Sequence, residues 1–311
     1  MTSDRPDILL IDQLPDSIIQ RLSSAFTLHR YENLEALRPI AEKIRAVTTG
    51  GGPGVPPDIM AALPNLEVIS VNGVGTDQID LNEARRRKIG VATTTGLLSD
   101  DVADMAIGLM LAVKRQIVTN DRFVRSGEWA KKPVRLSHTI GGQKVGIAGF
   151  GHIGQAIAQR AAAFNTEIAY FNSRPRTESS FRFEPDLKNL AAWCDILILA
   201  VSGGPRSANM VNAPILEALG PHGVLINISR GSVVDEDALI SALREGTIAG
   251  AGLDVFQNEP NINDAFFTLE NTVLQAHQAS ATQETRSAMG NLVVENLLAH
   301  FAGRPLLTPV I

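Results

Sequence analysis

The sequence has 311 residues, of which 44% are apolar and 20% are charged. This balance is typical of one large or two ordinary folded domains and excludes a largely disordered chain. The net charge of −5 argues against general nucleic-acid binding, for which a basic surface is expected.

The first third of the chain alternates short apolar runs with polar or helical segments. The runs predict strands at 7–12, 45–50, 67–73 and 89–95. None of the apolar runs in the sequence is long enough to cross a bilayer. The first residues lack a basic stretch followed by a long apolar segment, so no secretory signal is expected.

The same rhythm returns in the second part of the chain. Continuous apolar strands separated by helices are typical of parallel sheets that are covered on both faces. We therefore expect an α/β protein with two doubly wound parallel-sheet units. The strands predicted for the second unit are 144–151, 167–173, 195–202, 223–229, 249–256 and 272–278.

Two long helices are predicted, one from near Ser99 to about Ser126 and one from near Thr282 to Gly303. They either pack inside one domain or form the crossings between two domains. In the second case the N-terminal domain would recover the end of the chain. Helical periodicity is compatible with both arrangements.

The single cysteine, Cys194, rules out a disulfide within the chain. A reducing compartment is then the default, and a cytoplasmic location is expected. Cys194 precedes the apolar run "DILILAV", which favours a buried small side chain over a nucleophile. No cluster of Cys and His ligands is evident, so no metal is expected.

A glycine-rich turn lies between the strand predicted at 144–151 and the helix that follows it. Gly149 permits a tight turn, Gly151 lets the backbone approach a pyrophosphate, and Gly154 allows the helix to pack close to the strand. At the start of that helix, His152 and Ile153 add N–H groups that a phosphate can accept. This pattern predicts dinucleotide binding; the alternative is a turn that serves packing alone.

The end of the next strand bears on the choice of coenzyme. An NAD-binding unit places an acidic residue there for the ribose hydroxyls, whereas this sequence has Asn172, Ser173 and Arg174. A guanidinium can pair with a 2′-phosphate, and a serine can add a hydroxyl donor. We therefore predict NADP(H) as the preferred coenzyme, with NAD(H) possible. Alternatively, Arg174 is only a solvated cation.

Three polar residues follow later strands and suit the reduction of a carbonyl group. Arg230 can bind a carboxylate and polarise a ketone. A free imidazole has a pKa of about 6.5, so the residue type of His277 suits the donation of a proton near neutrality. Glu259 can stabilise the imidazolium. Because ligands gather beyond the carboxyl ends of parallel strands, these residues are candidates for one site, although each alone could be an ordinary surface or core residue.

Taken together, these segments resemble the D-2-hydroxyacid dehydrogenase family over almost the whole chain. Within the family, the sequence is most similar to the NADPH-dependent hydroxypyruvate/glyoxylate reductases and the related hydroxyphenylpyruvate reductases, on "FVRSGEWA" and "LLTPVI". The segments that carry the wider resemblance are "NGVGTDQIDL", "LLSDDVADMAIGLMLAVKR", "AGFGHIGQAIAQR", "LINISRGSVVDEDALISAL", "GAGLDVFQNEP" and "QAHQAS".

The resemblance implies two Rossmann-like domains with a cleft between them. Residues 1–98 and 284–311 would form a discontinuous substrate domain, and 99–283 would form the dinucleotide-binding domain. Closure of the cleft would exclude water. The resemblance also implies a homodimer, in which Trp129 reaches the active site of the partner.

The resemblance further assigns roles to individual residues. Arg230 would hold the keto acid, His277 would donate the proton, and Glu259 would pair with His277. One departure is Ala276, since many relatives have proline immediately before the histidine. The backbone N–H groups of Val74 and Gly75 would bind the substrate carboxylate. Asp254 would contact the nicotinamide carboxamide, and Ser229 would also face the coenzyme.

The expected function is NADPH-dependent reduction of a small 2-keto acid, glyoxylate or hydroxypyruvate, to the 2-hydroxy acid. Three alternatives remain at this point. The first is a bulkier substrate such as hydroxyphenylpyruvate. The second is a phosphoglycerate or formate dehydrogenase, which would carry added regions that we do not expect at this length. The third is a non-enzymatic protein that senses dinucleotides.

Overall fold

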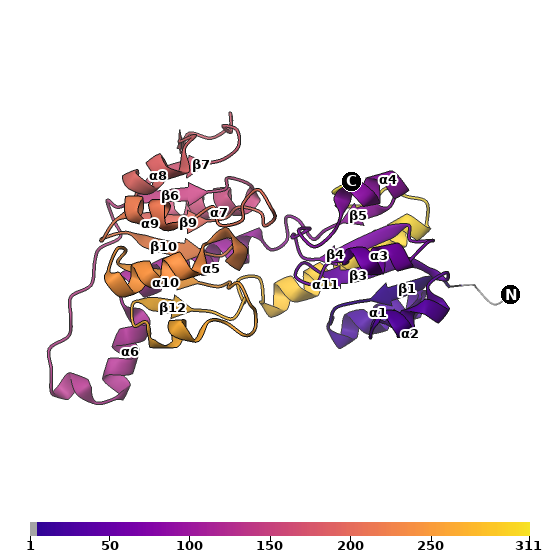
Figure 1. The fold of residues 1–311 in the computed structure, drawn as a ribbon, viewed down its shortest axis with the longest axis horizontal. Helices are drawn as coiled ribbons and strands as arrows, with labels where there is room; N and C mark the ends of the chain where they lie inside the picture. The colour runs from indigo at the N-terminus through magenta and orange to yellow at the C-terminus, as the bar shows by residue number, and fades with distance from the viewer. Residues whose placement is uncertain (1–4) are drawn as a thin grey trace. The chain divides into compact units, whose positions relative to one another are not determined.

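The computed structural model describes residues 5–311, and the chain is divided between two α/β units (Figure 1). The first unit holds the residues up to Leu98 together with Thr282–Ile311, and the second holds Ser99–Ala281. The chain therefore changes unit immediately before each of the two long helices. No helix among residues 5–311 combines the length and the apolar character needed to span a membrane.

The first unit contains a sheet of five parallel strands in the order β2-β1-β3-β4-β5. The interior strand β4 is buried on both faces, as its apolar composition predicts. The edge strand β2 was not expected from the sequence, because it is polar and half-exposed. The strands are β1 (Asp7–Leu10), β2 (Thr27–Arg30), β3 (Ile44–Gly50), β4 (Val68–Asn72) and β5 (Gly90–Ala92).

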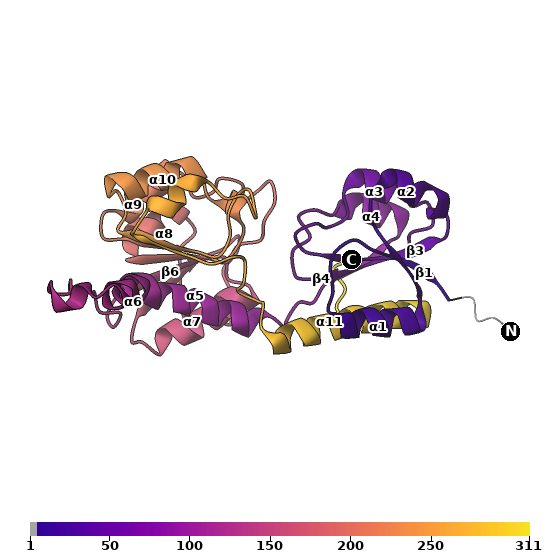
Figure 2. The same cartoon turned by 90° about the horizontal axis from the view of Figure 1, so that it is seen from below.

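Helices cover both faces of this sheet (Figure 2). Helices α1 and α11 lie on one face, where they pack on Ile8, Leu10 and Val68. The shorter helices α2, α3 and α4 lie on the other face. The helices are α1 (Asp16–Ala25), α2 (Leu34–Leu37), α3 (Pro57–Ala62), α4 (Leu81–Arg87) and α11 (Gln283–Phe301), with a 3-10 turn η1 (Arg38–Ile40).

The second unit contains a sheet of seven parallel strands in the order β12-β11-β10-β9-β6-β7-β8. The two parallel sheets confirm the predicted α/β class with two doubly wound units. Only the short edge strand β8 was not expected. The strands are β6 (Lys144–Ala148), β7 (Glu167–Phe171), β8 (Arg182–Phe183), β9 (Ile196–Leu199), β10 (Val224–Asn227), β11 (Gly250–Leu253) and β12 (Thr272–Leu274).

Helices also lie on both faces of the second sheet, with α5 and α7 on one face and α8, α9 and α10 on the other (Figure 2). Three further segments are 3-10 turns: η2 (Glu128–Ala130), η3 (Gly231–Val233) and η4 (Asp264–Thr268). The helices are α5 (Ser99–Lys114), α6 (Ile117–Arg125), α7 (His152–Ala162), α8 (Leu187–Trp193), α9 (Ala213–Leu219) and α10 (Glu236–Glu245).

The first long helix was predicted as one element to about Ser126, and this prediction was wrong. The chain breaks between α5 and α6 at Gln116, whose φ of 54° lies in the left-handed region. Neither glycine nor proline marks this break in the sequence. The second long helix was predicted correctly, since Thr282 caps it by accepting a hydrogen bond from the N–H of Thr285 at 3.1 Å.

Cys194 is buried, as its sequence context predicts. Its sulfur faces the backbone of β6, where a Cβ at Gly146 would lie 2.9 Å from Sγ. Burial raises the pKa of the thiol to about 12, so the sulfur stays protonated at neutral pH and is unsuited to act as a nucleophile.

Candidate active site

The glycine turn follows β6 and leads into α7. Gly149 has a φ of 92°, and a Cβ there would lie 2.5 Å from the carbonyl oxygen of Ala200. A Cβ at Gly154 would lie 2.1 Å from the carbonyl oxygen of Gly149. Both glycines are therefore required by close packing, as the dinucleotide-binding pattern demands.

Gly151 differs from its two partners because its Cβ direction is open, with no atom within 4 Å. It is the N-cap residue of α7, which starts with His152 and Ile153, and no side chain caps this helix. The first N–H groups of a helix need partners, and an uncapped helix start with open space in front of it fits a phosphate group.

The loop after β7 is tied to this turn by contacts that sequence reasoning did not reveal. The ring of Tyr170 stacks on Phe150 with 3.9 Å between the ring centroids. The Tyr170 hydroxyl accepts a hydrogen bond from the N–H of Arg176 at 2.8 Å. The Arg176 Nε donates to the carbonyl oxygen of Phe150 at 3.3 Å. The only sequence signal for these contacts was the spacing of Tyr170 and Arg176, an aromatic residue and an arginine six positions apart.

The coenzyme candidates at the end of β7 lie on the surface of this loop. Ser173 and Arg174 are exposed, and Asn172 is half-buried. The Asn172 Nδ2 donates to the carbonyl oxygen of Arg174 at 3.1 Å, which fixes the turn from which the guanidinium extends. No acidic residue occupies positions 172–174.

The other polar candidates follow three neighbouring strands at one edge of the sheet. Arg230 comes after β10, Asp254 after β11 and His277 after β12, and these strands pair in register as β10 with β11 and β11 with β12. The structure therefore brings these three residues to the same carboxyl edge, where parallel sheets hold their ligands.

His277 and Glu259 form a pair, with 2.6 Å between His277 Nδ1 and Glu259 Oε2. The other carboxylate oxygen, Oε1, accepts the N–H of Phe256 at 2.8 Å. Burial alone would raise the pKa of Glu259, but these hydrogen bonds and the charge of Arg230 hold it below its ordinary value. The carboxylate thus stays ionised and orients the imidazole, with Nε2 as the nitrogen left for proton transfer.

Asp254 fixes the backbone on which His277 stands. Its carboxylate is 1% exposed and accepts the N–H groups of Gln278 at 2.7 Å and Ala279 at 3.0 Å. Burial raises the pKa of Asp254 above its ordinary value, and the two backbone N–H groups offset part of this effect. Ala276, the residue before His277, stands where the resemblance led us to expect proline. Its carbonyl oxygen accepts a hydrogen bond from Gln278 Nε2 at 3.0 Å.

Arg230 is half-buried, and its turn packs on the segment that leads to Glu259. A Cβ at Gly231 would lie 1.9 Å from the carbonyl carbon of Phe256, so only glycine fits there. The buried Asn227 donates through Nδ2 to the carbonyl oxygen of Arg230 at 3.0 Å. Asn227 was missed, although an asparagine at the end of the run "VLIN" is an unusual polar interruption.

Four predicted residues are not part of this cluster of polar side chains. Ser229 is buried, and its hydroxyl donates to the carbonyl oxygen of Val201. Trp129 lies on η2, after α6 rather than after a strand, and is 62% exposed. Val74 and its neighbour Gly75 belong to the other unit, in the loop that follows β4.

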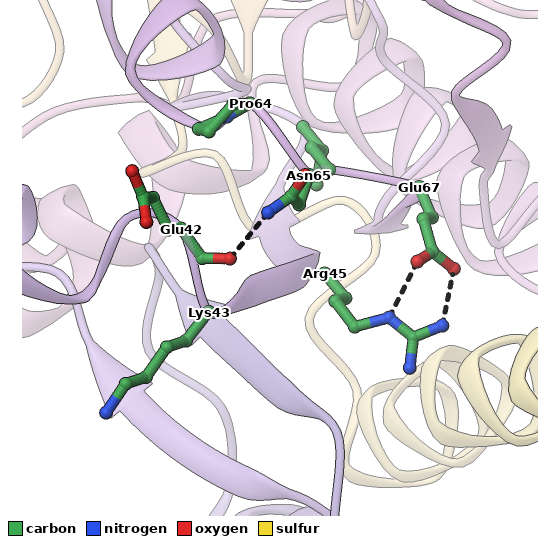
Figure 3. Close-up of a pocket in the computed structure, with 7 residues that line it drawn as sticks. Glu42, Lys43, Arg45, Pro64, Asn65 and Glu67 are labelled. Atoms are coloured by element: carbon green, nitrogen blue, oxygen red, sulfur yellow. Dashed lines mark hydrogen bonds and ion pairs between the residues drawn. The ribbon is translucent and has the colours of Figure 1, made fainter.

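In the first unit, a cavity of about 360 Å³ lies at the amino ends of β3 and β4, whereas Val74 and Gly75 follow the carboxyl end of β4 (Figure 3). Two of its four charged residues pair with each other, since Arg45 Nε donates to Glu67 Oε1 at 2.6 Å. None of the predicted site residues lines it, so we assign it no part in the chemistry. The lining residues are Glu42, Lys43, Arg45, Pro64, Asn65, Leu66 and Glu67.

Comparison with known proteins agrees with the chemistry of these residues. Residues 107–279 match the model of the NAD-binding domain of the D-isomer-specific 2-hydroxyacid dehydrogenases. The chain is 66% identical to a 2-ketogluconate reductase of Gluconobacter oxydans over 99% of its own length and 100% of the relative's. It is 43% identical to a hydroxyphenylpyruvate reductase of Plectranthus scutellarioides, with 98% of each chain covered.

Among solved structures, the chain is similar to an NADPH-dependent glyoxylate/hydroxypyruvate reductase of Sinorhizobium meliloti in complex with NADP and malonate. The TM-score is 0.93 and the sequence identity is 41%, over 98% of this chain and 97% of that one.

Proposed function

The chain belongs to the D-isomer-specific 2-hydroxyacid dehydrogenase family and is a reductase of 2-keto acids, and on that premise we propose that it reduces hydroxylated 2-keto acids with NADPH. We take 2-ketogluconate as the principal substrate, because the relative with that activity is 66% identical over nearly the whole chain. Hydroxypyruvate and glyoxylate, the substrates expected from the sequence, are retained as smaller substrates. The observation that carries the proposal is the 2.6 Å pair of His277 and Glu259 beside the Arg230 turn.

In the proposed reaction, a bound nicotinamide coenzyme supplies the hydride to the keto carbon. His277 Nε2 gives its proton to the carbonyl oxygen, and Glu259 balances the charge of the imidazolium through Nδ1. Arg230 polarises the carbonyl and stabilises the alkoxide as charge develops on it. The N–H groups of Val74 and Gly75 bind the carboxylate of the substrate.

We propose that the coenzyme is held at the start of α7 and by the loop after β7. The open space at Gly151 admits the pyrophosphate. The carboxylate of Asp254 accepts two backbone N–H groups and contacts the nicotinamide carboxamide through its remaining lone pairs. The exposed Arg174, with Ser173 beside it, pairs with the 2′-phosphate, which favours NADPH. The NADP complex of the similar Sinorhizobium meliloti enzyme supports this preference.

We also propose that the chain forms a homodimer through the segment that begins with α6. This segment projects from the body of its unit (Figure 1). It carries exposed apolar side chains, of which Leu136 is 93% exposed and Trp129 62% exposed. A concentration of exposed apolar side chains is typical of a protein interface. Replacement of Leu136 by Asp should yield monomers in light-scattering chromatography; an unchanged mass would refute this interface.

A steady-state panel tests the function directly. Purified protein is assayed with NADPH and with NADH against 2-ketogluconate, hydroxypyruvate, glyoxylate and 4-hydroxyphenylpyruvate. We expect the highest kcat/KM for 2-ketogluconate with NADPH. A protein that binds NADPH but oxidises it with none of these substrates would support the non-enzymatic alternative.

The variant His277→Ala tests the proposed proton donor. Reduction should be largely abolished, because no other group supplies the proton to the carbonyl oxygen. Binding of NADPH, followed by fluorescence titration, should persist, because the imidazole is not part of the glycine turn. Turnover close to that of the unaltered protein would remove His277 from the mechanism.

A further inference from the structure

Three neighbouring strands of the first unit end in one row of residues on a single face of the sheet. The β1–β3 register pairs Leu10 with Thr48, and two residues farther along from each of them Asp12 lies against Gly50. The β3–β4 register pairs Gly50 with Asn72. We call Asp12, Gly50 and Asn72 the edge row. It lies at the carboxyl end of the sheet, on the face that α1 and α11 cover.

Within the edge row, the carboxylate of Asp12 occupies the space that a side chain at position 50 would fill. A Cβ at Gly50 would lie 2.0 Å from Asp12 Oδ2. The other oxygen, Oδ1, accepts the N–H of Gln13 at 2.7 Å. Asp12 is half-buried. A glycine at position 50 thus leaves room for this carboxylate, and Oδ2 is turned along the row toward Gly50.

Unpartnered polar atoms are concentrated at this end of the sheet. In the part of the chain that the structure describes, four buried side-chain oxygens lack a hydrogen-bond partner, and three of them belong to Thr48, Asn72 and Thr94. Thr48 lies two residues before Gly50, and Thr94 donates its N–H to the carbonyl oxygen of Gly73 at 2.9 Å. Buried polar atoms are rarely left unpaired, so this grouping indicates an edge built for a polar partner.

The edge row adjoins the loop that we propose to bind the substrate carboxylate. A Cβ at Gly51 would lie 3.4 Å from the backbone nitrogen of Gly75, and a Cβ at Gly73 would lie 3.2 Å from the nitrogen of Gly51. The two loops are therefore packed backbone to backbone. Because residues 50–52 are all glycine, no side chain of that run stands between the loop that holds Val74 and Gly75 and the carboxylate of Asp12.

We propose that Asp12 is a specificity-determining residue that accepts hydrogen bonds from the tail hydroxyls of a 2-keto sugar acid, with the Asn72 amide farther along the same edge row. This inference rests on the proposed function, because it requires a keto acid held at Val74 and Gly75. Hydrogen bonds from hydroxyls to a carboxylate are strong. The same carboxylate disfavours an aromatic tail, which cannot solvate it, and an anionic tail, which it repels.

The test compares a substrate with a polyhydroxylated tail to one without a tail. The ratio of kcat/KM for 2-ketogluconate to kcat/KM for glyoxylate should fall about tenfold or more in Asp12→Asn, mainly because the sugar acid binds less tightly and its KM rises. Gly50→Ala should lower the same ratio, because the added methyl group displaces the carboxylate. Asp12→Leu should raise kcat/KM for phenylpyruvate relative to that for 2-ketogluconate.

Asp58→Asn is the matched control, because Asp58 lies in the same unit and also accepts the N–H of the residue that follows it, at 2.9 Å. It stands on α3, on the other face of the sheet, and should keep the wild-type ratio. Failure of the unaltered protein to reduce 2-ketogluconate, with glyoxylate reduced, would refute the principal substrate and the subsite together. A wild-type protein active on both, with the ratio unchanged in Asp12→Asn, would overturn the subsite alone.

Discussion

The backbone N–H of His277 donates to the carbonyl oxygen of Asp254 at 2.8 Å, and this bond ties the end of β12 to the end of β11. His277 has a φ of 54°, in the left-handed region that costs a non-glycine residue of order 1 kcal/mol. The buried carboxylate of Asp254 holds the next two N–H groups, so one side chain maintains the strained backbone beneath the imidazole.

The variant Asp254→Asn should therefore disturb His277 without removing it. An amide places an N–H₂ group where one of two N–H donors now finds an oxygen, so the loop has to move. A displacement of about 1 Å at a reacting group can cost about 100-fold in rate. We expect kcat for 2-ketogluconate to fall between about 10-fold and 100-fold, measured at saturating NADPH.

Asp195→Asn provides the comparison for this variant. Asp195 also accepts a backbone N–H, that of Lys144 at 2.8 Å, but it lies at the amino end of the same sheet. Its replacement should change kcat by less than about twofold. Equal kcat values in Asp254→Asn and the unaltered protein would show that the clamp on the loop is unimportant for catalysis.

The pKa of Glu259 leads to a prediction about pH. It lies below its ordinary value of 4.5, so this carboxylate is ionised throughout the neutral range. In Glu259→Gln the imidazole loses its charged partner at every pH, so kcat/KM for reduction should fall about tenfold or more at neutral pH. The unaltered protein should lose kcat/KM as the pH falls through the lowered pKa of Glu259, and Glu259→Gln should lack this acidic limb. An acidic limb that is the same in both proteins would contradict a role for the Glu259 carboxylate.

The lowered pKa of Glu259 also determines how the stability of the folded protein depends on pH. Because the pKa of Glu259 is lower in the folded protein than in the unfolded chain, its contribution is present above the ordinary value of 4.5 and is lost as the pH falls below it. Glu259→Gln should lower Tm at neutral pH, and the difference from the unaltered protein should shrink as the pH falls below 4.5. A difference that grows on acidification would refute the assigned direction.

Sequence patterns identified the buried strands because burial on both faces demands a continuous apolar run, as in "VLIN" of β10. They failed at β2 and β8, which lie at sheet edges and need no such run. They also failed at Gln116, where a left-handed residue ends α5 without glycine or proline. These features depend on tertiary contacts that no local pattern records.

The candidate site shows the same division. Residue type and position after a strand were enough to select Arg230, Glu259 and His277 as candidates. The clamp made by Asp254 and the support that Asn227 gives to the Arg230 turn were not evident, because each depends on backbone groups brought close by folding. A polar residue at the end of an apolar strand is the signal that points to such supports.

The glycine turn offers a test that separates packing from coenzyme binding. Gly151 has a φ of −81° and open space in its Cβ direction, so Gly151→Ala is compatible with the fold. A methyl group there would block the approach of a pyrophosphate. We expect the Kd for NADPH to rise about tenfold or more with little change in Tm. Gly154→Ala should instead lower Tm, because its Cβ would lie 2.1 Å from the Gly149 oxygen. An unchanged Kd in Gly151→Ala would favour a turn that serves packing alone.

Arg174 is the residue on which the coenzyme preference depends. The neighbouring Arg176 is engaged with the carbonyl oxygen of Phe150 at 3.3 Å, whereas Arg174 extends from an exposed turn. Arg174→Ala should raise KM for NADPH about tenfold or more and leave KM for NADH nearly unchanged, since NADH lacks the 2′-phosphate. Arg182 lies on the next strand, β8, with its guanidinium over the ring of Trp193. Arg182→Ala should alter neither KM value. If KM rises equally for both coenzymes in Arg174→Ala, the guanidinium supports the loop and does not read the phosphate.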